Sequence, residues 1–393
     1  MTKYQSKISF LVLMIIAGHC CYQIEPAWDV DSGVLLNPSP DCGIIATLSE
    51  IEKNKTHGRM NGTGLVGLMG GVHLKAQSAG SYDVLISLPQ MADSQVPVFY
   101  SLETTPRGAL QQALIQNYDG VNQAVSIRIK AEKNQEVIIN WSSAVLIYSK
   151  PLILNSTPPI EFLKPSLCVQ SEDSEIATLA EKLWQKSRSV RDYAFNIQKL
   201  VMNMNPQSQP KSLDALGILR SGNNMICTSN ANLACALMRA KKVPSRIIAV
   251  IPTIPKKYEM HRIVEYFDGK EWISFDPSLV NADIPLKPWQ NIIMAKTTIA
   301  DEDLAMKPRL GSMMGCPFGQ EAEFSKFGLN FYDQDFFWTM AAPLFEFDVS
   351  QETAKKVENL WTSFLKTGFR ASAQINATKA RDAVTFCKVI ECE

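Results

Sequence analysis

Apolar and polar residues alternate between about residues 81 and 150, as they do in strands that bury one face. In SYDVLISLP every second residue from Tyr82 to Leu88 is apolar, and similar alternation recurs in VPVFYSL, AVSIRIKAE and EVIINWS. Such strands suit antiparallel pairing, with one face against a core and the other in water. The pattern predicts an antiparallel β-sandwich domain over residues 25–160.

The hydrophobic period changes after the proline-containing segment LNSTPPIEFLKPS, which suits a linker. Residues 175–204 follow the period of an amphipathic helix, and a second helical pattern begins near Cys227. Further along, the pattern is mixed, with one good helix candidate in QETAKKVENLWTSFLKTG. We therefore expect an α+β core at 168–285 and a mixed α/β C-terminal extension at 286–393.

The composition is that of an ordinary globular protein. The chain has 393 residues, of which 46% are hydrophobic and 20% are charged, and Lys+Arg 39 balances Asp+Glu 39. This length allows two or three domains. The absence of net charge argues against nucleic acid as a partner. The oligomeric state cannot be read from the sequence.

The N-terminus has the pattern of an export signal. Lys3 and Lys7 precede the apolar run ISFLVLMIIAG, and no acidic residue occurs before Glu25. The run is short for a membrane span, so residues 1–22 are predicted to be a signal peptide. A secreted or periplasmic location follows.

Two cysteines behind the apolar run raise an alternative fate for the N-terminus. A lipid on Cys20 or Cys21 would attach the protein to a membrane surface, but His19 stands where a small residue should precede the modified cysteine. We favour ordinary cleavage. The chain has 9 cysteines, and export of an odd number predicts disulfides with at least one thiol left over.

The sequence predicts neither a metal nor a cofactor. It contains no CxxC pair, and its 4 histidines are scattered. The segment GTGLVG at 62–67 matches the dinucleotide pattern G-x-G-x-x-G, but polar residues precede it and strand-like residues follow it. That pattern binds a dinucleotide only between a strand and a helix. A glycine-rich turn is favoured here.

The stretch EMHRIVEYFDGKEWISFDPS predicts a hairpin with chemistry at its open end. Asp268-Gly269 between two alternating apolar runs indicates a two-residue loop. With that loop, His261 lies opposite Asp276, close enough for the carboxylate to hold the imidazole. A one-residue bulge would shift this pairing.

Cys227 precedes the second helical pattern, with Thr228 or Ser229 as candidate caps for the first turn. At a helix N-terminus the macrodipole stabilises an anion, and a nearby imidazolium would lower the thiol pKa further. Alone, such a cysteine is more often buried and inert. Cys235 lies inside the apolar stripe of the same helix and is predicted to be core.

Together these residues resemble the core of the transglutaminase-like superfamily of papain-fold cysteine enzymes. The resemblance covers about residues 213–279. It rests on a cysteine at a helix start, an Arg-Ala pair and a Pro-Ser-Arg turn after that helix, a histidine strand, a tryptophan and an Asp-Pro pair. The matching positions are Cys227, Ala231, Leu237, Arg239, Ala240, VPSR at 243–246, His261, Trp272, Asp276 and Pro277.

The resemblance implies a papain-like core in which the cysteine helix packs on an antiparallel sheet, and a Cys227, His261, Asp276 triad for acyl transfer. The substrate would be a peptide or protein amide, attacked by hydrolysis or transamidation. The backbone N–H of Cys227 is one natural oxyanion donor. Trp184 is a candidate for the second.

Three departures from the family pattern support an alternative. Met225 and Lys242 replace customary glycines, and Arg262 follows His261 where the family usually has alanine. None removes a triad member. Met225 and Arg262 motivate the alternative that this is a catalytically inactive binding or scaffold protein with a transglutaminase fold.

Overall fold

The computed structural model describes two main parts of the chain. These are residues 64–147 with gaps at 77, 88, 107 and 118–120, and residues 160–204, 212–222, 226–252, 261–279 and 282–302 with a gap at 300–301; short strands at 329–330, 339–340, 345–346 and 383–385 complete the set. The predicted signal peptide at 1–22, with Cys20 and Cys21, lies outside the described residues, as do Met225 and the predicted helix at 351–368.

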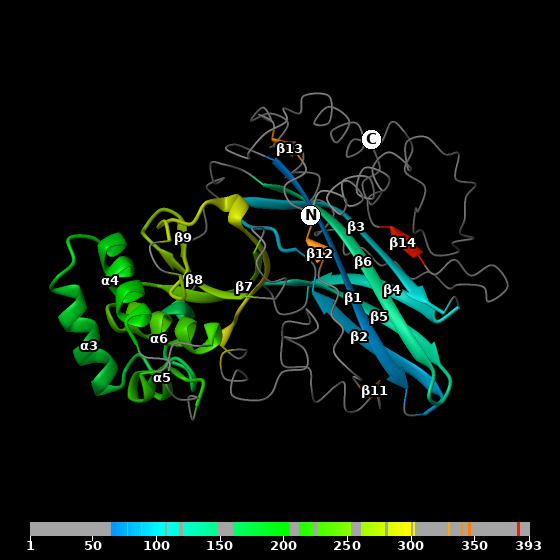
Figure 1. Cartoon of the computed structure of the whole chain (residues 1–393), viewed down its shortest axis with the longest axis horizontal. Helices are drawn as coiled ribbons and strands as arrows, with labels where there is room; N and C mark the ends of the chain where they lie inside the picture. The colour runs from blue at the N-terminus through cyan, green and yellow to red at the C-terminus, as the bar shows by residue number, and fades with distance from the viewer. Residues whose placement is uncertain are drawn as a thin grey trace.

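The predicted strands form two antiparallel sheets (Figure 1). One sheet has the order β11-β1-β6-β3-β14, with β12 and β13 also paired to β1, and the other has the order β2-β5-β4. The strands are β1 (Gly64–Ala76), β2 (Gly80–Ser87), β3 (Gln95–Thr105), β4 (Leu110–Asn117), β5 (Gln123–Ala131), β6 (Glu136–Ile147), β11 (Leu329–Asn330), β12 (Thr339–Met340), β13 (Phe345–Glu346) and β14 (Ala383–Thr385). The alternation follows burial, since Ile127 and Ile129 on β5 are both fully buried.

The GTGLVG segment is neither a nucleotide loop nor a turn over its described residues. Residues 64–67 belong to β1, which pairs antiparallel with β6. The turn interpretation was therefore wrong for these positions, because the glycines continue into a long strand.

The helical part contains η1 (Ile160–Leu163), α3 (Ser174–Trp184), α4 (Val190–Met202), α5 (Ala215–Ser221) and α6 (Cys227–Ala240). The helical pattern predicted over 175–204 is divided between α3 and α4, because Ser189 caps α4 by accepting a hydrogen bond from the N–H of Asp192. The segment expected to be a linker ends in η1, where Phe162 is buried against the ring of Trp272.

The third sheet belongs to the predicted α+β core. Its order is β10-β7-β8-β9, formed by β7 (Ser245–Pro252), β8 (His261–Phe267), β9 (Trp272–Phe275) and β10 (Asn291–Lys296), the last preceded by η2 (Pro288–Gln290). All its pairs are antiparallel. β10 lies beyond residue 285, where the sequence interpretation ended the core, yet it pairs with β7. A core boundary at 285 would cut this sheet.

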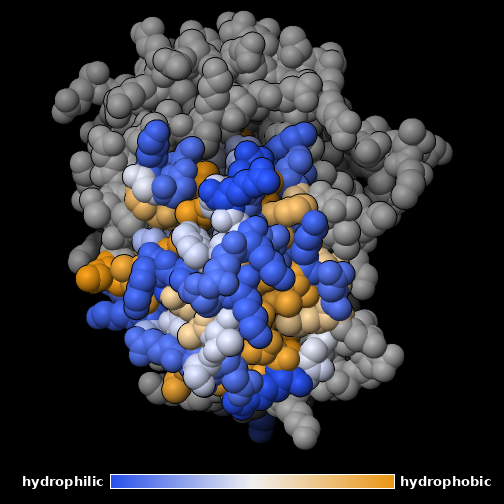
Figure 2. Space-filling model, turned by 90° about the vertical axis from the view of Figure 1, so that its left-hand side faces the viewer, coloured by the Kyte–Doolittle hydropathy of each residue, from blue (hydrophilic) through white to orange (hydrophobic). Residues whose placement is uncertain are grey.

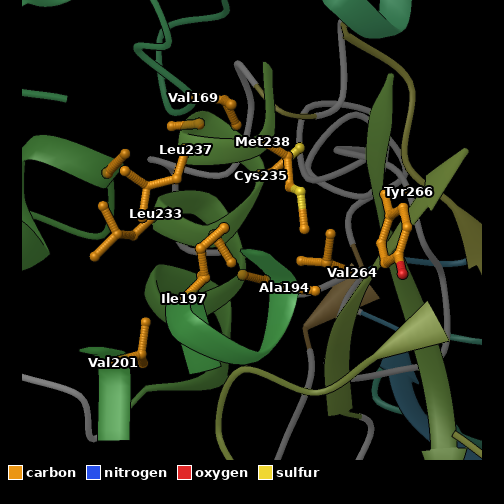
Figure 3. Packing of buried hydrophobic residues seen from close by; sticks show 14 of the residues in the cluster. Val169, Ala194, Ile197, Val201, Leu233, Cys235, Leu237, Met238, Val264 and Tyr266 are labelled. Atoms are coloured by element: carbon orange, nitrogen blue, oxygen red, sulfur yellow. The ribbon is translucent and has the colours of Figure 1, made fainter. Parts of the chain in front are cut away.

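Helix α6 packs on one face of this sheet (Figure 1). Figure 3 shows Cys235 on the side of α6 that faces Val264 of β8, with Leu233 and Leu237 on another side of the helix. From Ser229 to Arg239 every residue of α6 is buried. Helix α6 is therefore a central element, and its first residue, Cys227, is held by packing along the helix's length.

The outer edge of β10 is covered by side chains from the N-terminal sheets. Gln95 brackets Ile293: its Nε2 donates to the Ile293 carbonyl at 2.8 Å, and its Oε1 accepts from the Ile293 N–H at 2.9 Å. Gln90 and Asn122 make similar bonds to Met294 and Lys296. These bonds occupy edge-strand groups that would otherwise be unpaired and dock the N-terminal part on the core.

The end of the molecule formed by the helices presents a mainly polar surface with apolar groups between (Figure 2). This agrees with amphipathic helices that bury one face. Within the described ranges, no helix combines the length and apolarity needed to span a bilayer.

Candidate active site

Cys227 is the first residue of α6. The residue before it, Ile226, is the N-cap, and no side chain caps this end of the helix. The expected cap by Thr228 or Ser229 was wrong, because the Ser229 hydroxyl instead donates to the Ile226 carbonyl at 2.9 Å. The first-turn N–H groups therefore have no capping side chain, and their partial positive charge lies beside the Cys227 sulfur.

His261 and Asp276 come from the β8–β9 hairpin, whose loop differs from the predicted one. Phe267 pairs with Trp272, so the loop spans residues 268–271 rather than two residues. The Asp268 side chain holds it by accepting from the N–H groups of Lys270 and Glu271. The register is thus displaced by two residues from the prediction. Because side chains alternate with a period of two, the displacement leaves each residue on its predicted face.

The histidine and the aspartate meet at the open end of the hairpin. Nε2 of His261 lies 2.6 Å from Oδ2 of Asp276, and Oδ1 of Asp276 accepts from the N–H of Ser278 at 2.7 Å. The Asp276 side chain is 2% exposed, whereas that of His261 is 22% exposed. The carboxylate is therefore fixed and dry, and the imidazole remains accessible through its other nitrogen, Nδ1.

The thiol of Cys227 completes the arrangement. The side chain of His261 and the backbone N–H of Arg262 lie close enough to the sulfur to lower its pKa. Since Nε2 of His261 is engaged by Asp276, Nδ1 is the nitrogen left for the sulfur. The structure thus brings Cys227, His261 and Asp276 together in the order that a nucleophile, a base and an orienting carboxylate require.

Electrostatics favour an ion pair between the thiol and the imidazole. Burial alone would raise the pKa of Cys227, but the hydrogen bond and charge of His261 and the contacts of Arg262 bring this pKa below its ordinary value. Burial would lower the pKa of His261, but hydrogen bonds and charges of Asp276 and Cys227 raise it to about 10. Both shifts favour a thiolate beside an imidazolium over the neutral pair.

Two polar residues that the sequence analysis missed support the site. Nε2 of Gln198 on α4 donates to the main-chain carbonyl of Asp276 at 2.9 Å. Nδ2 of Asn230, one turn after Cys227, donates to the Ser278 hydroxyl at 3.0 Å. The signal was available, because Gln198 falls on the helical period of the apolar face of α4, where a polar side chain needs a partner.

Cys235 is core, as predicted. It is fully buried on α6, and its sulfur lies 3.3 Å from the Ser245 hydroxyl. Burial raises its pKa to about 12. Cys227 and Cys235 are both free thiols, and only the first has a lowered pKa and a histidine partner.

Trp184 is not the second oxyanion donor. It lies at the end of α3, where its ring packs against the ring of Tyr193. The ammonium of Lys241 lies 5.6 Å from the centroid of the Trp184 ring. Lys241 is the C-cap of α6. A helix of 14 residues is roughly 20 Å long, so Trp184 lies near the opposite end from Cys227.

Two of the family departures fall on described residues. Arg262 is buried, and its backbone contacts the nucleophile. Lys242 has φ 59°, the left-handed conformation that explains why glycine is customary there. Among the described residues no cluster of histidine, cysteine or carboxylate side chains could hold a metal ion.

Comparison with known proteins places this site in a family. A model of the transglutaminase-like superfamily matches residues 175–277, and these residues form a transglutaminase-like domain. The α+β core predicted from the sequence is thereby confirmed. The comparison with curated proteins found no match.

Solved structures give weaker similarities. A predicted cysteine protease from Cytophaga hutchinsonii is 18% identical, with a TM-score of 0.49 over 62% of this chain and 84% of that one. The periplasmic domain of TgpA from Pseudomonas aeruginosa is 13% identical, with a TM-score of 0.28 over 63% and 94%. A predicted protease from Parabacteroides distasonis is 15% identical, with a TM-score of 0.22 over 52% and 47%. The function must therefore be argued from this chain's own residues.

Proposed function

We propose that this protein is an exported cysteine-dependent enzyme that transfers acyl groups from peptide or protein amides, with Cys227 as nucleophile, His261 as acid and base, and Asp276 as orienting carboxylate. The observation that carries the proposal is the continuous chain of contacts from the Cys227 thiol through His261 to the buried Asp276 carboxylate, 2.6 Å from Nε2. Export rests on the N-terminal sequence.

The first half of the reaction forms a thioester. The Cys227 thiolate attacks the carbonyl carbon of the amide, and the resulting oxyanion accepts a hydrogen bond from the backbone N–H of Cys227 at the uncapped start of α6. As the intermediate collapses, the carbon–nitrogen bond breaks, and His261 gives its proton to the departing amine. Asp276 stabilises the imidazolium before this transfer and keeps the ring oriented.

The second half releases the acyl group. Water or a primary amine attacks the thioester carbon and gives a proton to His261, and the carbon–sulfur bond breaks to restore the thiolate. Water gives hydrolysis, and an amine gives transamidation. Both outcomes use the same three residues, so the residues alone do not choose between them.

The test measures turnover of glutamine-containing peptides, short peptides and cell-wall peptide fragments, each with and without an added primary amine. Amine incorporation identifies transamidation, whereas release of ammonia or a peptide without incorporation identifies hydrolysis. Cys227→Ala should abolish turnover. Asp276→Asn should reduce it about 10³- to 10⁴-fold, because the amide disfavours the required tautomer and imidazolium.

Cys235→Ala is the matched control, because it removes a thiol from the same helix that is buried and has a raised pKa. It should keep full activity. If no substrate turns over and Cys227 is no more reactive than a model thiol, the proposal is replaced by that of an inactive transglutaminase-fold scaffold, which the substitutions at Met225 and Arg262 would explain.

A further inference from the structure

A cavity of about 160 Å³ lies on the face of the core sheet opposite α6. Its floor is formed by apolar side chains of the sheet, and its side by the turn at residues 92–94 of the N-terminal part and by the segment before β10. The apolar lining includes Ala92, Ile248, Val250, Ile263, Leu286 and Ile293. None of the three proposed catalytic residues lines it.

One charged pair in this cavity is already satisfied. The guanidinium of Arg246 lies 2.8 Å from the carboxylate of Glu265, and both side chains are nearly buried. The same guanidinium lies over the ring of Trp272, 3.9 Å from its centroid. Arg246 therefore has both an anionic and an aromatic partner, so an anionic ligand would have to compete with Glu265 for it.

Asp93 also lines the cavity, but unlike Arg246 and Glu265 it is not part of a close ion pair with any described residue. Its side chain has no hydrogen bond to the described residues either, although Lys296 and Arg246 act on it through charge. Burial, with a smaller effect of Glu265 and Glu271, raises its pKa to about 6, against the opposing effects of Lys296 and Arg246. Above that pH the cavity contains a partly desolvated carboxylate whose charge Lys296 and Arg246 offset only in part.

The position of Asp93 is set by the junction between the two parts of the chain. It occupies a turn closed by hydrogen bonds between Ala92 and Gln95. Gln95 is itself bonded on both sides to the backbone of Ile293 in β10. The backbone of Asp93 is thus held by a turn anchored to the sheet whose face it overlooks.

We propose that this cavity binds a primary ammonium group on a short apolar stem, as in a lysine side chain of a peptide or a free alkylamine, with the ammonium on Asp93 and the stem on the apolar floor. A cavity of about 150 Å³ admits a benzene-sized molecule, so 160 Å³ suits a stem of four or five carbons with its ammonium. Glu265 in the lining is paired with Arg246, and Lys287 and the nearby Lys296 offset the remaining negative charge. The preference for a cation therefore rests on the Asp93 carboxylate, which lines the cavity without a close ion-pair partner among the described residues.

The cavity is close to the proposed catalytic strand. Val250 in its lining is the ladder partner of His261, and Ile263 is two residues from His261 along β8. A basic side chain held here would place a peptide chain along that strand. The binding itself does not depend on catalysis and can be measured in protein that lacks the nucleophile.

The experiment uses the full chain carrying Cys227→Ala and titrates it with n-pentylamine by calorimetry. Saturable binding is expected at pH 7.5, where the amine is charged (its pKa is about 10) and Asp93 is ionised. At pH 5 the affinity should fall about tenfold, because Asp93 with a pKa of about 6 is then mostly protonated. Asp93→Asn should abolish the binding and its pH dependence while preserving the fold, since an amide carries no charge to desolvate.

Two controls separate the ammonium site from other causes. Glu172→Gln, a change at an exposed carboxylate away from the cavity, should leave binding unchanged. The alcohol 1-pentanol has the same stem without charge and should bind much more weakly. Equal affinity for amine and alcohol, no binding at pH 7.5, or unchanged binding by Asp93→Asn would each overturn the proposal.

A blocked peptide, acetyl-Gly-Lys-Gly-amide, identifies the source of the ammonium. Binding of the peptide at least as tight as that of n-pentylamine, and lost with Asp93→Asn, supports a peptide side chain. Binding of n-pentylamine alone supports a free amine. Both results preserve the site, and neither requires that the protein be an active acyltransferase.

Discussion

The side-chain amide of Gln198 on α4 donates to the main-chain carbonyl of Asp276 at 2.9 Å. Gln198 is 1% exposed, and its own Oε1 has no partner among the described residues. The buried amide of Gln198 makes this one hydrogen bond while its oxygen remains without a partner in the described part of the chain. We infer that the position of Asp276 depends on the bond. Gln198 is thus a positioning residue, which acts on His261 only through the aspartate.

Gln198→Met should therefore weaken the protein and its site together. The side chains are similar in size, but methionine cannot donate, so the buried Asp276 carbonyl is left without this partner at a cost of about 1–3 kcal/mol. We expect a lower urea midpoint, a reduced kcat with little change in KM, and a shifted pH profile of Cys227 alkylation. A variant that lost stability but kept the wild-type pH profile would show a purely structural role.

Gln185→Met is the matched control for this change. Gln185 is exposed at the end of α3, and its side-chain amide donates to the Glu181 carboxylate at 2.9 Å. Its replacement should alter neither the urea midpoint nor the alkylation profile.

The hairpin shows how far a sequence pattern reaches. Asp268-Gly269 marked the turn correctly, but the loop spans 268–271, because Asp268 folds its side chain onto the following N–H groups. The error of two residues preserves the face on which each side chain lies. The contact of His261 with Asp276 was therefore predicted correctly from an incorrect register. The face on which a side chain lies survives a shift of two residues, whereas the identity of its cross-strand partner does not.

Features that join distant segments could not be predicted. The sequence pattern marked the buried face of α4 but gave no reason to connect Gln198 with a carbonyl 78 residues later. It also ended the core before β10, because a single edge strand covered by Gln95 has no distinctive period. Local patterns identify elements and faces, whereas pairing between elements depends on the packing of the whole chain.

The thiolate–imidazolium pair predicts unusual reactivity of Cys227. A free thiol with a pKa of about 8.5 is only roughly 0.3% thiolate at pH 6, whereas the lowered pKa of Cys227 gives it a larger thiolate fraction there. Because the pKa of His261 is raised to about 10, the imidazolium persists as the pH rises through neutrality. The rate of iodoacetamide alkylation at Cys227, followed by peptide mapping, should exceed that of a model thiol at pH 6 and rise less steeply with pH.

His261→Gln provides the comparison for this profile. It removes the positive charge, so the pKa of Cys227 should rise and the alkylation rate at pH 6 should fall at least tenfold, with a smaller difference at pH 9. A wild-type rate that rises tenfold per pH unit up to 8.5, as in a model thiol, would contradict the ion pair.

Lys242 predicts a stabilising substitution. It follows the C-cap of α6 with φ 59°, and the N–H of Val243 donates to the Met238 carbonyl in the pattern of a Schellman motif. The left-handed conformation costs a non-glycine residue about 1–2 kcal/mol, and glycine returns part of this through its more flexible unfolded state. Lys242→Gly should therefore raise the free energy of unfolding by about 0.5–1 kcal/mol in urea titrations.

Lys242→Ala separates backbone strain from loss of charge. Alanine removes the ammonium but still has a Cβ, so it should give little or none of the stabilisation. Equal gains from alanine and glycine would place the effect in the side chain and refute the conformational explanation.

Arg239 and Glu302 form a fully buried ion pair behind the nucleophile helix. Nη1 and Nη2 of Arg239 lie 2.8 Å and 2.6 Å from the two carboxylate oxygens of Glu302, and both side chains are 0% exposed. The guanidinium also donates to the carbonyls of Ser245 and Lys164. One side chain of α6 thus connects the helix to β7, to the segment after η1 and to the end of the described core.

Glu302→Leu should lower the free energy of unfolding by about 3–5 kcal/mol, because it leaves the Arg239 guanidinium buried without its counter-ion. Glu302→Gln should cost less, since the amide oxygen still accepts from the guanidinium.

The matched control is Glu175→Leu, which breaks an exposed ion pair. The side chains of Arg220 and Glu175 are 60% and 50% exposed. In water such a pair contributes little, and no measurable change is expected. Urea unfolding of the three variants decides the matter: similar small shifts for Glu302→Leu and Glu175→Leu would show that the buried guanidinium finds other partners and that the pair does not hold α6 in place.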